Sequence, residues 1–185
     1  HKEYRRQRQM CIRDSINAII NISITNKKDN ILDENSIIKS YKRVSGFYDA
    51  TFGQVFRPGQ KAIIKKMDCS STDSVLEIGI GTGSSLQYYP DETKVVGIDI
   101  SPDMLDVAKK RIIEDRAQNK HILLMNGEEL TFADNTFDKV VGMYVVSVTQ
   151  DPKKLISEMK RVCKNDGDIY ICLLYTSDAA DDTPC

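Results

Sequence analysis

The stretch Asp73-Ser-Val-Leu-Glu-Ile-Gly-Ile-Gly-Thr-Gly-Ser-Ser85 is the strongest indication of fold and ligand in this chain. It contains the short, mainly apolar run Val75–Ile78, which predicts a buried strand. A glycine turn follows, and glycine permits positive φ and a close approach of a ligand to the backbone. The glycines occupy alternate positions: Gly79, Gly81 and Gly83. A helix that begins at about Ser84 would direct its free N–H groups to the same space, so we expect a small molecule across the turn.

Two carboxylates indicate which small molecule this is. Glu77 lies two residues before the first glycine, where its charge repels a pyrophosphate but suits an ammonium or a sulfonium. The run Val95–Ser101 predicts a second buried strand, and its Asp99 lies 16 residues after the last glycine, where a carboxylate can meet ribose hydroxyls. The G-x-G-x-G spacing also differs from the G-x-G-x-x-G of dinucleotide-binding turns. We therefore expect Glu77 and Asp99 to face one cavity that holds a positively charged nucleoside.

The combination Glu77-x-Gly79-x-Gly81-x-Gly83 and Gly97-Ile-Asp99 resembles the first two motifs of class I S-adenosylmethionine-dependent methyltransferases. The resemblance implies S-adenosyl-L-methionine as the cofactor. It implies that Glu77 contacts the amino-acid end of the cofactor directly or through water, and that Asp99 binds the ribose hydroxyls. Ile100 and Met104 would then pack on the adenine, although a core position on a helix explains Met104 equally well.

A third segment, Met125–Phe132, resembles the family's G-D-A-E-x-L-P-F motif. There an Asp side chain accepts a hydrogen bond from the adenine amino group, and the next backbone N–H reaches the ring. Asn126 stands at that Asp position and its amide oxygen is still an acceptor, while Gly127 supplies the backbone N–H. Met143 begins the segment at which the family's substrate-facing residues lie, so the resemblance places it beside the cofactor.

The predicted elements alternate between strand and helix, which indicates an α/β fold with a parallel sheet covered on both faces. Strands are expected at Val75–Ile78, Val95–Asp99, His121–Met125, Lys139–Met143 and, after a turn at Asn165–Gly167, Asp168–Ile171. Helices are expected over Lys61–Met67, after Ser101-Pro102 and after Asp151-Pro152. The expected fold is a Rossmann-like three-layer methyltransferase domain with a helical N-terminal segment, truncated after the fifth strand.

The sequences at the two ends of the chain differ in character from a native protein sequence. Back-translated, His1–Ser15 can be encoded by a sequence that resembles a transposase-type sequencing adapter, and residues 172–185 by its reverse complement. We therefore expect both ends to be adapter-derived, residues 16–35 to be a leader of uncertain origin, and residues 36–171 to be a partial methyltransferase domain. The ends carry as many basic as acidic residues, so the net charge of −1 holds without them and gives no reason to expect a nucleic-acid partner.

Membrane and metal signals are weak in the remaining sequence. No apolar run approaches the roughly 20 residues of a membrane span, and no signal-peptide pattern is visible. Cys69 and Cys163 form neither a disulfide framework nor a metal cluster, so we expect no metal and a reducing compartment. These features predict a cytoplasmic protein that is at most peripheral at the inner membrane surface.

Two further segments resemble one subfamily. Tyr48-Asp-Ala-Thr-Phe-Gly-x-Val-Phe-x-x-Gly59 and Met143-Tyr-Val-Val-Ser-Val148 are similar to bacterial phosphatidylethanolamine N-methyltransferases of the soluble, peripheral type. The resemblance implies that Tyr48 and Tyr144 line the space of methyl transfer, and that Tyr41 closes over the cofactor. The basic helix over Lys61–Met67 would suit anionic headgroups, with an ordinary solvated face as an equal alternative.

Other functions stay open. A carbon methyltransferase of ubiquinone or menaquinone biosynthesis shares the cofactor motifs and an early Tyr-Asp. A nicotinamide-binding Rossmann domain is disfavoured by the glycine spacing and by Glu77. A nucleotide-binding fragment without catalysis is the third alternative, and the sequence gives no indication of the oligomeric state.

Overall fold

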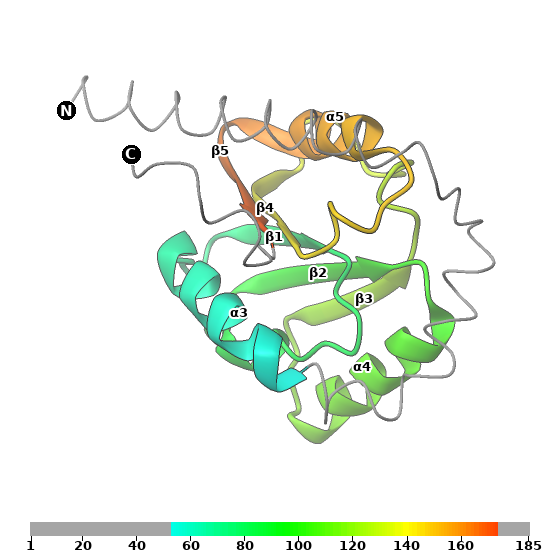
Figure 1. Ribbon diagram of the computed structural model, residues 1–185. Helices are drawn as coiled ribbons and strands as arrows, with labels where there is room; N and C mark the ends of the chain where they lie inside the picture. Colours follow the sequence, from blue (N-terminus) through cyan, green and yellow to red (C-terminus); the bar gives the residue numbers. More distant parts are fainter. Residues whose placement is uncertain (1–52, 174–185) are drawn as a thin grey trace, which may run out of the picture.

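The computed structural model describes residues 53–173 (Figure 1). Tyr41 and Tyr48 lie outside this range, as do residues 1–15 and most of the C-terminal segment expected to be adapter-derived. Five strands form one parallel sheet in the order β3-β2-β1-β4-β5. Their bounds are β1 Ser74–Ile78, β2 Lys94–Asp99, β3 Lys120–Leu124, β4 Phe137–Met143 and β5 Cys163–Cys172. This arrangement confirms the Rossmann-like parallel sheet expected from the sequence.

The chain changes direction across the sheet at β1. From β1 it runs to β2 and β3 on one side, then returns to β4 and β5 on the other. β1 therefore pairs with both β2 and β4, and Ile78 at its end lies opposite Ile98 and Gly142. In open parallel sheets, ligands bind outside the carboxyl ends of the strands at such a reversal. The fold thus places the glycine turn, which follows Ile78, at the expected binding position.

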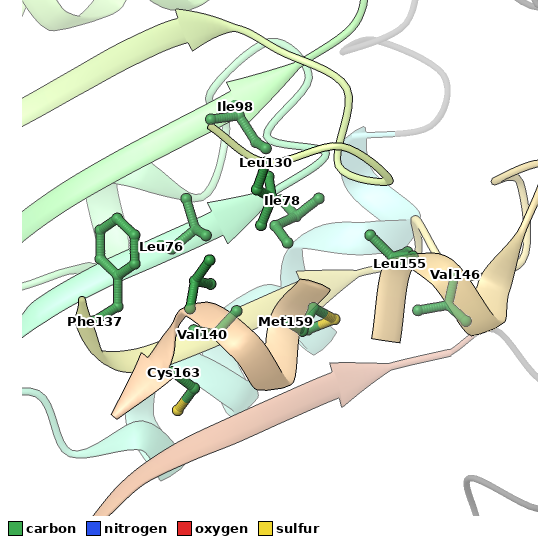
Figure 2. Close-up of a cluster of buried hydrophobic side chains, with 11 residues drawn as sticks. Leu76, Ile78, Ile98, Leu130, Phe137, Val140, Val146, Leu155, Met159 and Cys163 are labelled. Carbon is green, nitrogen blue, oxygen red and sulfur yellow. The ribbon is translucent and has the colours of Figure 1, made fainter. Parts of the chain in front are cut away.

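Helices cover both faces of the sheet (Figure 1). One face carries α3 (Gly53–Met67), the short 3₁₀ helix η1 (Leu86–Tyr88) and α4 (Pro102–Glu114), and the other carries α5 (Pro152–Val162). Because side chains alternate along a strand, Val75 packs toward α3 whereas Leu76 packs toward α5. Figure 2 shows the α5 side of the core, where Leu155 and Met159 lie near Val140 of β4. The two hydrophobic layers hold β1 at the centre of the domain.

The starts of two helices follow the capping signals in the sequence. Before α4, the Ser101 hydroxyl accepts a hydrogen bond from the Met104 N–H at 3.4 Å. Before α5, the Asp151 carboxylate accepts from the N–H groups of Lys153 and Lys154 at 3.1 and 3.2 Å. Proline occupies the first turn in both helices, where its missing N–H costs nothing.

Three expected elements differ in the structure. The helix expected to begin at about Ser84 forms only as the 3₁₀ helix η1, because Pro90 favours an extended conformation at the preceding Tyr89. α3 begins at Gly53 and continues through Pro58, earlier than the expected Lys61. The expected Asn165–Gly167 turn lies inside β5, where it produces a register shift against β4. Among residues 53–173, no helix combines the length and apolarity needed to cross a bilayer.

Candidate functional site

A pocket opens at the carboxyl ends of β1, β2 and β4, beside the glycine turn. Most of the residues expected at the site contribute to its wall. These lining residues are Gly79, Gly81, Asp99, Ile100, Met104, Asn126, Gly127, Met143 and Tyr144. Glu77 and Gly83 are not among the lining residues, and Tyr41 and Tyr48 lie outside the described range. Met104 is also 2% exposed on α4, so it is both a core residue and part of the pocket wall.

The three glycines of the turn all have positive φ, with values of 74°, 57° and 73°. Their surroundings differ. A Cβ on Gly79 would lie 2.7 Å from the Cβ of Val145, and a Cβ on Gly83 would lie 3.0 Å from the Cβ of Ala108. A Cβ on Gly81 would meet no atom within 4 Å. Gly79 and Gly83 therefore let the turn pack closely on its neighbours, whereas Gly81 leaves its backbone open toward the pocket.

Asp99 at the end of β2 fixes the glycine turn from the pocket side. Its Oδ2 accepts a hydrogen bond from the Gly81 N–H at 2.8 Å, and its Oδ1 accepts from the Ser101 N–H at 2.9 Å. Burial raises the pKa of Asp99, and the backbone N–H donors oppose that shift. The neighbouring Ile98 carbonyl accepts from the N–H groups of Gly79 and Ile80 at 2.8 and 3.0 Å. The turn is thus attached to β2 by backbone and side-chain bonds together.

Glu77 does not reach the pocket. Its side chain is 2% exposed, and it accepts hydrogen bonds from the Ser85 hydroxyl at 2.7 Å and the Tyr89 hydroxyl at 2.8 Å. Burial raises the pKa of Glu77 to about 7, against the opposing effect of the two hydrogen bonds. The expectation that Glu77 and Asp99 face one cavity is wrong for Glu77. Strand alternation directs Glu77 to the same face as Val75, beneath α3 and η1, whereas the pocket lies beyond the strand end.

The segment after β3 contributes polar side chains to the pocket, and these side chains also form hydrogen bonds within the protein. The Asn126 Oδ1 accepts a hydrogen bond from the Glu128 N–H at 2.9 Å, so the expected acceptor already has one local partner. Glu128 also lines the pocket, and its Oε1 bonds the Thr149 hydroxyl and the Asp151 N–H, the latter at 2.9 Å. Glu128 therefore connects the segment after β3 to the segment after β4, a role that sequence reasoning missed.

Tyr144 follows β4 with a φ of +65°, in the left-handed region that bulky residues rarely adopt. Its N–H donates to the Cys172 carbonyl at 2.8 Å, and its hydroxyl donates to the Phe56 carbonyl of α3 at 3.4 Å. The Tyr144 and Phe56 rings have centroids 4.6 Å apart. Burial, with a smaller contribution from Cys172, raises the pKa of Tyr144 above its usual range, so the phenol stays neutral.

Other wall residues were not anticipated. Phe56 and Gln60 lie one helical turn apart on α3, a spacing that reveals a shared helix face, and the Gln60 Oε1 accepts from the Ser84 hydroxyl at 3.1 Å. The segment after β4 adds Val145, Val148, Thr149 and Gln150. Among the lining residues that the structure describes, the charged ones are Asp99 and Glu128, and both are acids. The pocket therefore favours a cationic ligand.

Comparisons with known proteins identify the family. A family model described as a methyltransferase domain matches residues 76–171. The phosphatidylethanolamine N-methyltransferase of Cereibacter sphaeroides is 37% identical over 141 residues, which are 76% of this chain and 68% of that protein. The demethylmenaquinone methyltransferase of Tropheryma whipplei is 32% identical over 142 residues, which cover 74% of this chain and 58% of that protein.

A solved structure is similar at the level of the fold. It is the Haemonchus contortus phospholethanolamine N-methyltransferase 2 in complex with phosphomonomethylethanolamine and S-adenosylhomocysteine. The TM-score is 0.57 and the sequence identity is 28%, with 62% of this chain and 27% of that chain covered.

The cofactor of these enzymes, S-adenosylmethionine, suits the pocket. Its sulfonium and ammonium groups match a wall whose charged residues are acids, and the open backbone at Gly81 leaves room for a ligand. Asp99 stands where the second strand of a nucleotide-binding sheet presents a carboxylate to ribose. With a methyltransferase family model over more than half of its length, the chain belongs to the S-adenosylmethionine-dependent methyltransferase family.

Proposed function

We propose that this chain carries the methyl-transfer site of an enzyme that N-methylates phosphatidylethanolamine. The observation that carries the proposal is the charge of the pocket, in which Asp99 and Glu128 are the charged lining residues of the described range. A headgroup ammonium is attracted by such a wall, whereas a neutral quinone gains nothing from it. The 37% identity to a phosphatidylethanolamine N-methyltransferase supports the same acceptor.

Within this proposal, the cofactor's nucleoside lies between the glycine turn and the segment after β3. Asp99 would bind the ribose hydroxyls, Ile100 and Met104 would pack on the adenine, and Asn126 and Gly127 would meet its edge. All five residues line the same pocket, which supports this placement. When bound, S-adenosylmethionine supplies a methyl group on a sulfonium, an electrophile that needs no metal.

The chain's own residues would contribute alignment and proton handling. The acceptor amine forms its N–C bond as the S–C bond breaks in line, so the reaction depends mainly on positioning. The amine must first lose its proton, and a carboxylate such as Glu128 or a water beside it can accept one. Tyr144, held neutral and fixed against α3, would shape the acceptor side of the pocket. Tyr48 and Tyr41 remain proposed for the acceptor space and the cofactor cover.

The acceptor is tested by supplying labelled methyl groups on S-adenosylmethionine to the intact gene product. Phosphatidylethanolamine vesicles and demethylmenaquinone are offered in parallel reactions. Label in phosphatidylethanolamine alone supports the proposal. Label in demethylmenaquinone alone would establish the second candidate, carbon methylation of a quinone, which the Tropheryma whipplei relative favours. Label in neither acceptor would contradict both assignments.

We also propose that residues 1–15 and 172–185 are adapter-derived, that residues 16–35 are a leader of uncertain origin, and that residues 36–171 are a partial methyltransferase domain. The family match ends at Ile171, one residue before the second segment begins, which supports that boundary. Cys172 continues β5, where its carbonyl accepts from the Tyr144 N–H, a backbone contact that any residue can make, and its side chain packs on the core beside Gly59. Sequencing the native locus tests the proposal, and finding these codons in the genome would overturn it.

A further inference from the structure

Glu77 is a buried carboxyl group that lies outside the pocket wall. Each of its oxygens accepts one hydrogen bond, Oε1 from the Ser85 hydroxyl at 2.7 Å and Oε2 from the Tyr89 hydroxyl at 2.8 Å. It is absent from the pocket wall, so its charge is not presented to a ligand there. Because both carboxyl oxygens are hydrogen-bonded within the protein, Glu77 points to a role other than direct ligand contact.

The positions of its partners indicate that role. Glu77 precedes the glycine turn on β1, whereas Ser85 and Tyr89 follow the turn, so the side chain joins the two ends of the segment that contains Gly79, Gly81 and Gly83. On the pocket side the same turn is held by Asp99 and the Ile98 carbonyl. The turn is therefore held at its two ends by Glu77 and from the pocket side by Asp99.

We propose that Glu77 is a positioning residue that fixes the shape of the glycine turn through Ser85 and Tyr89, and so sets the affinity for the cofactor without contacting it. This inference concerns the cofactor site and does not depend on the identity of the methyl acceptor. It differs from the direct or water-mediated contact that resemblance to the family implies for this acid.

The surroundings of Glu77 are consistent with a role that needs hydrogen bonds more than charge. α3 packs on this face through Ile64 and Met67, which are buried apolar residues. The titratable groups nearby belong to Tyr89 itself, to Lys120 of β3, whose Nζ lies 5.8 Å from the Tyr89 ring centroid, and to Cys69, which interacts with the Tyr89 hydroxyl. Burial raises the pKa of Glu77 to about 7, so the neutral acid is already compatible with the fold near neutral pH.

The test compares S-adenosylhomocysteine affinities by calorimetry, below the melting temperature of every variant. Glu77→Gln keeps a carbonyl oxygen that accepts a hydrogen bond, and its new amide N–H can donate to the hydroxyl of Ser85 or Tyr89. We expect its Kd to stay within about threefold of the unmodified chain. Glu77→Leu and the double variant Ser85→Ala/Tyr89→Phe remove the bonds, and we expect each to weaken binding about tenfold or more. Tyr88→Phe, on the same 3₁₀ helix, is the matched control and should bind normally.

A second readout follows the turn itself. Hydrogen–deuterium exchange over residues 79–89 should accelerate in the double variant and stay slow in Glu77→Gln and Tyr88→Phe. The proposal is overturned if Glu77→Gln loses binding about a hundredfold while Ser85→Ala/Tyr89→Phe binds normally, because that pattern requires a charge contact with the cofactor. If the double variant does not fold, Ser85→Ala alone is judged by the same two measurements.

Discussion

At the residue scale, the three glycines of the turn share a backbone conformation but have different reasons for lacking a side chain. Gly79 and Gly83 are in close contact with Val145 and Ala108, so their role is packing. Gly81 is the member with open space beside it, and its N–H is fixed by Asp99. The motif therefore combines two structural positions with one that is available to a ligand.

This division predicts different effects for alanine substitutions. Gly79→Ala should destabilise the fold by about 1–3 kcal/mol, because its Cβ would overlap Val145. Gly81→Ala should cost about 1–2 kcal/mol for the left-handed backbone, and it should also weaken S-adenosylhomocysteine binding about tenfold by filling the open space. Thermal denaturation and calorimetry on both variants measure the difference. Normal affinity in Gly81→Ala would show that no ligand approaches this backbone.

The pKa of Glu77 predicts how stability changes with pH. The Glu77 carboxyl retains its proton in the folded state up to a pH of about 7, whereas in the unfolded chain it has the ordinary pKa of 4.5. The unfolding free energy should therefore fall as pH rises through this window, with a slope of at most about 1.4 kcal/mol per pH unit from this group. Glu77→Gln lacks the effect, so its stability relative to the unmodified chain should rise from pH 4.5 to 7 and then level off. Urea denaturation across this range measures the unfolding free energies of both proteins. A difference between them that stays constant with pH would contradict the assigned pKa of Glu77.

At the element scale, α3 forms one wall of the pocket and packs against Tyr144 there. A Cβ on Gly59 of α3 would lie 2.0 Å from the Tyr144 Oη and 3.3 Å from its Cζ. Gly59→Ala should therefore destabilise the fold by about 1–3 kcal/mol through overpacking. Tyr144→Phe removes the overlapping atom. The unfolding free energy of the double variant should therefore fall by less than the sum of the two single losses. A double-mutant cycle of unfolding free energies measures this coupling. If the two losses are strictly additive, the Tyr144 hydroxyl does not lie beside Gly59.

The outer side of α3 leads to a prediction about membranes. Ile64 and Met67 are buried against the sheet, whereas Arg57, Lys61, Lys65 and Lys66 are exposed, so any contact with a bilayer would be electrostatic. Charge reversal of the three lysines should abolish co-sedimentation with anionic vesicles at low salt. The matched control reverses Lys109, Lys110 and Lys153, which are exposed on α4 and α5. Equal losses in both variants would indicate a general charge effect and would contradict a docking role for α3.

At the scale of the whole molecule, the sequence predicted the strands and their roles better than the helices around them. Runs such as Val95–Asp99 identify buried strands because both faces of a parallel sheet are apolar. The course after the glycine turn was not predicted, because Pro90 stops a helix that the turn alone would favour. The start of α3 was missed because Pro58 and Gly59 usually indicate a break.

The pocket was predictable where a motif supplies backbone or strand-end groups, as for Gly81 and Asp99. It was less predictable where the direction of a side chain determines whether a residue belongs to the pocket wall. Glu77 has the sequence position of a ligand contact, yet strand alternation and the hydroxyls of Ser85 and Tyr89 direct it into the core. Glu128 was missed because its partners, including Thr149, come close only after β3 and β4 are placed in the sheet.

The nucleoside site is tested by calorimetric titration of S-adenosylhomocysteine into the unmodified chain and into Asp99→Ala, with NAD titrated in parallel. If the pocket at the ends of β1, β2 and β4 holds the nucleoside, the unmodified chain should bind one S-adenosylhomocysteine, Asp99→Ala should bind it at least about tenfold more weakly, and NAD should give no signal. Binding of NAD without S-adenosylhomocysteine, or an affinity unchanged by Asp99→Ala, would contradict the account.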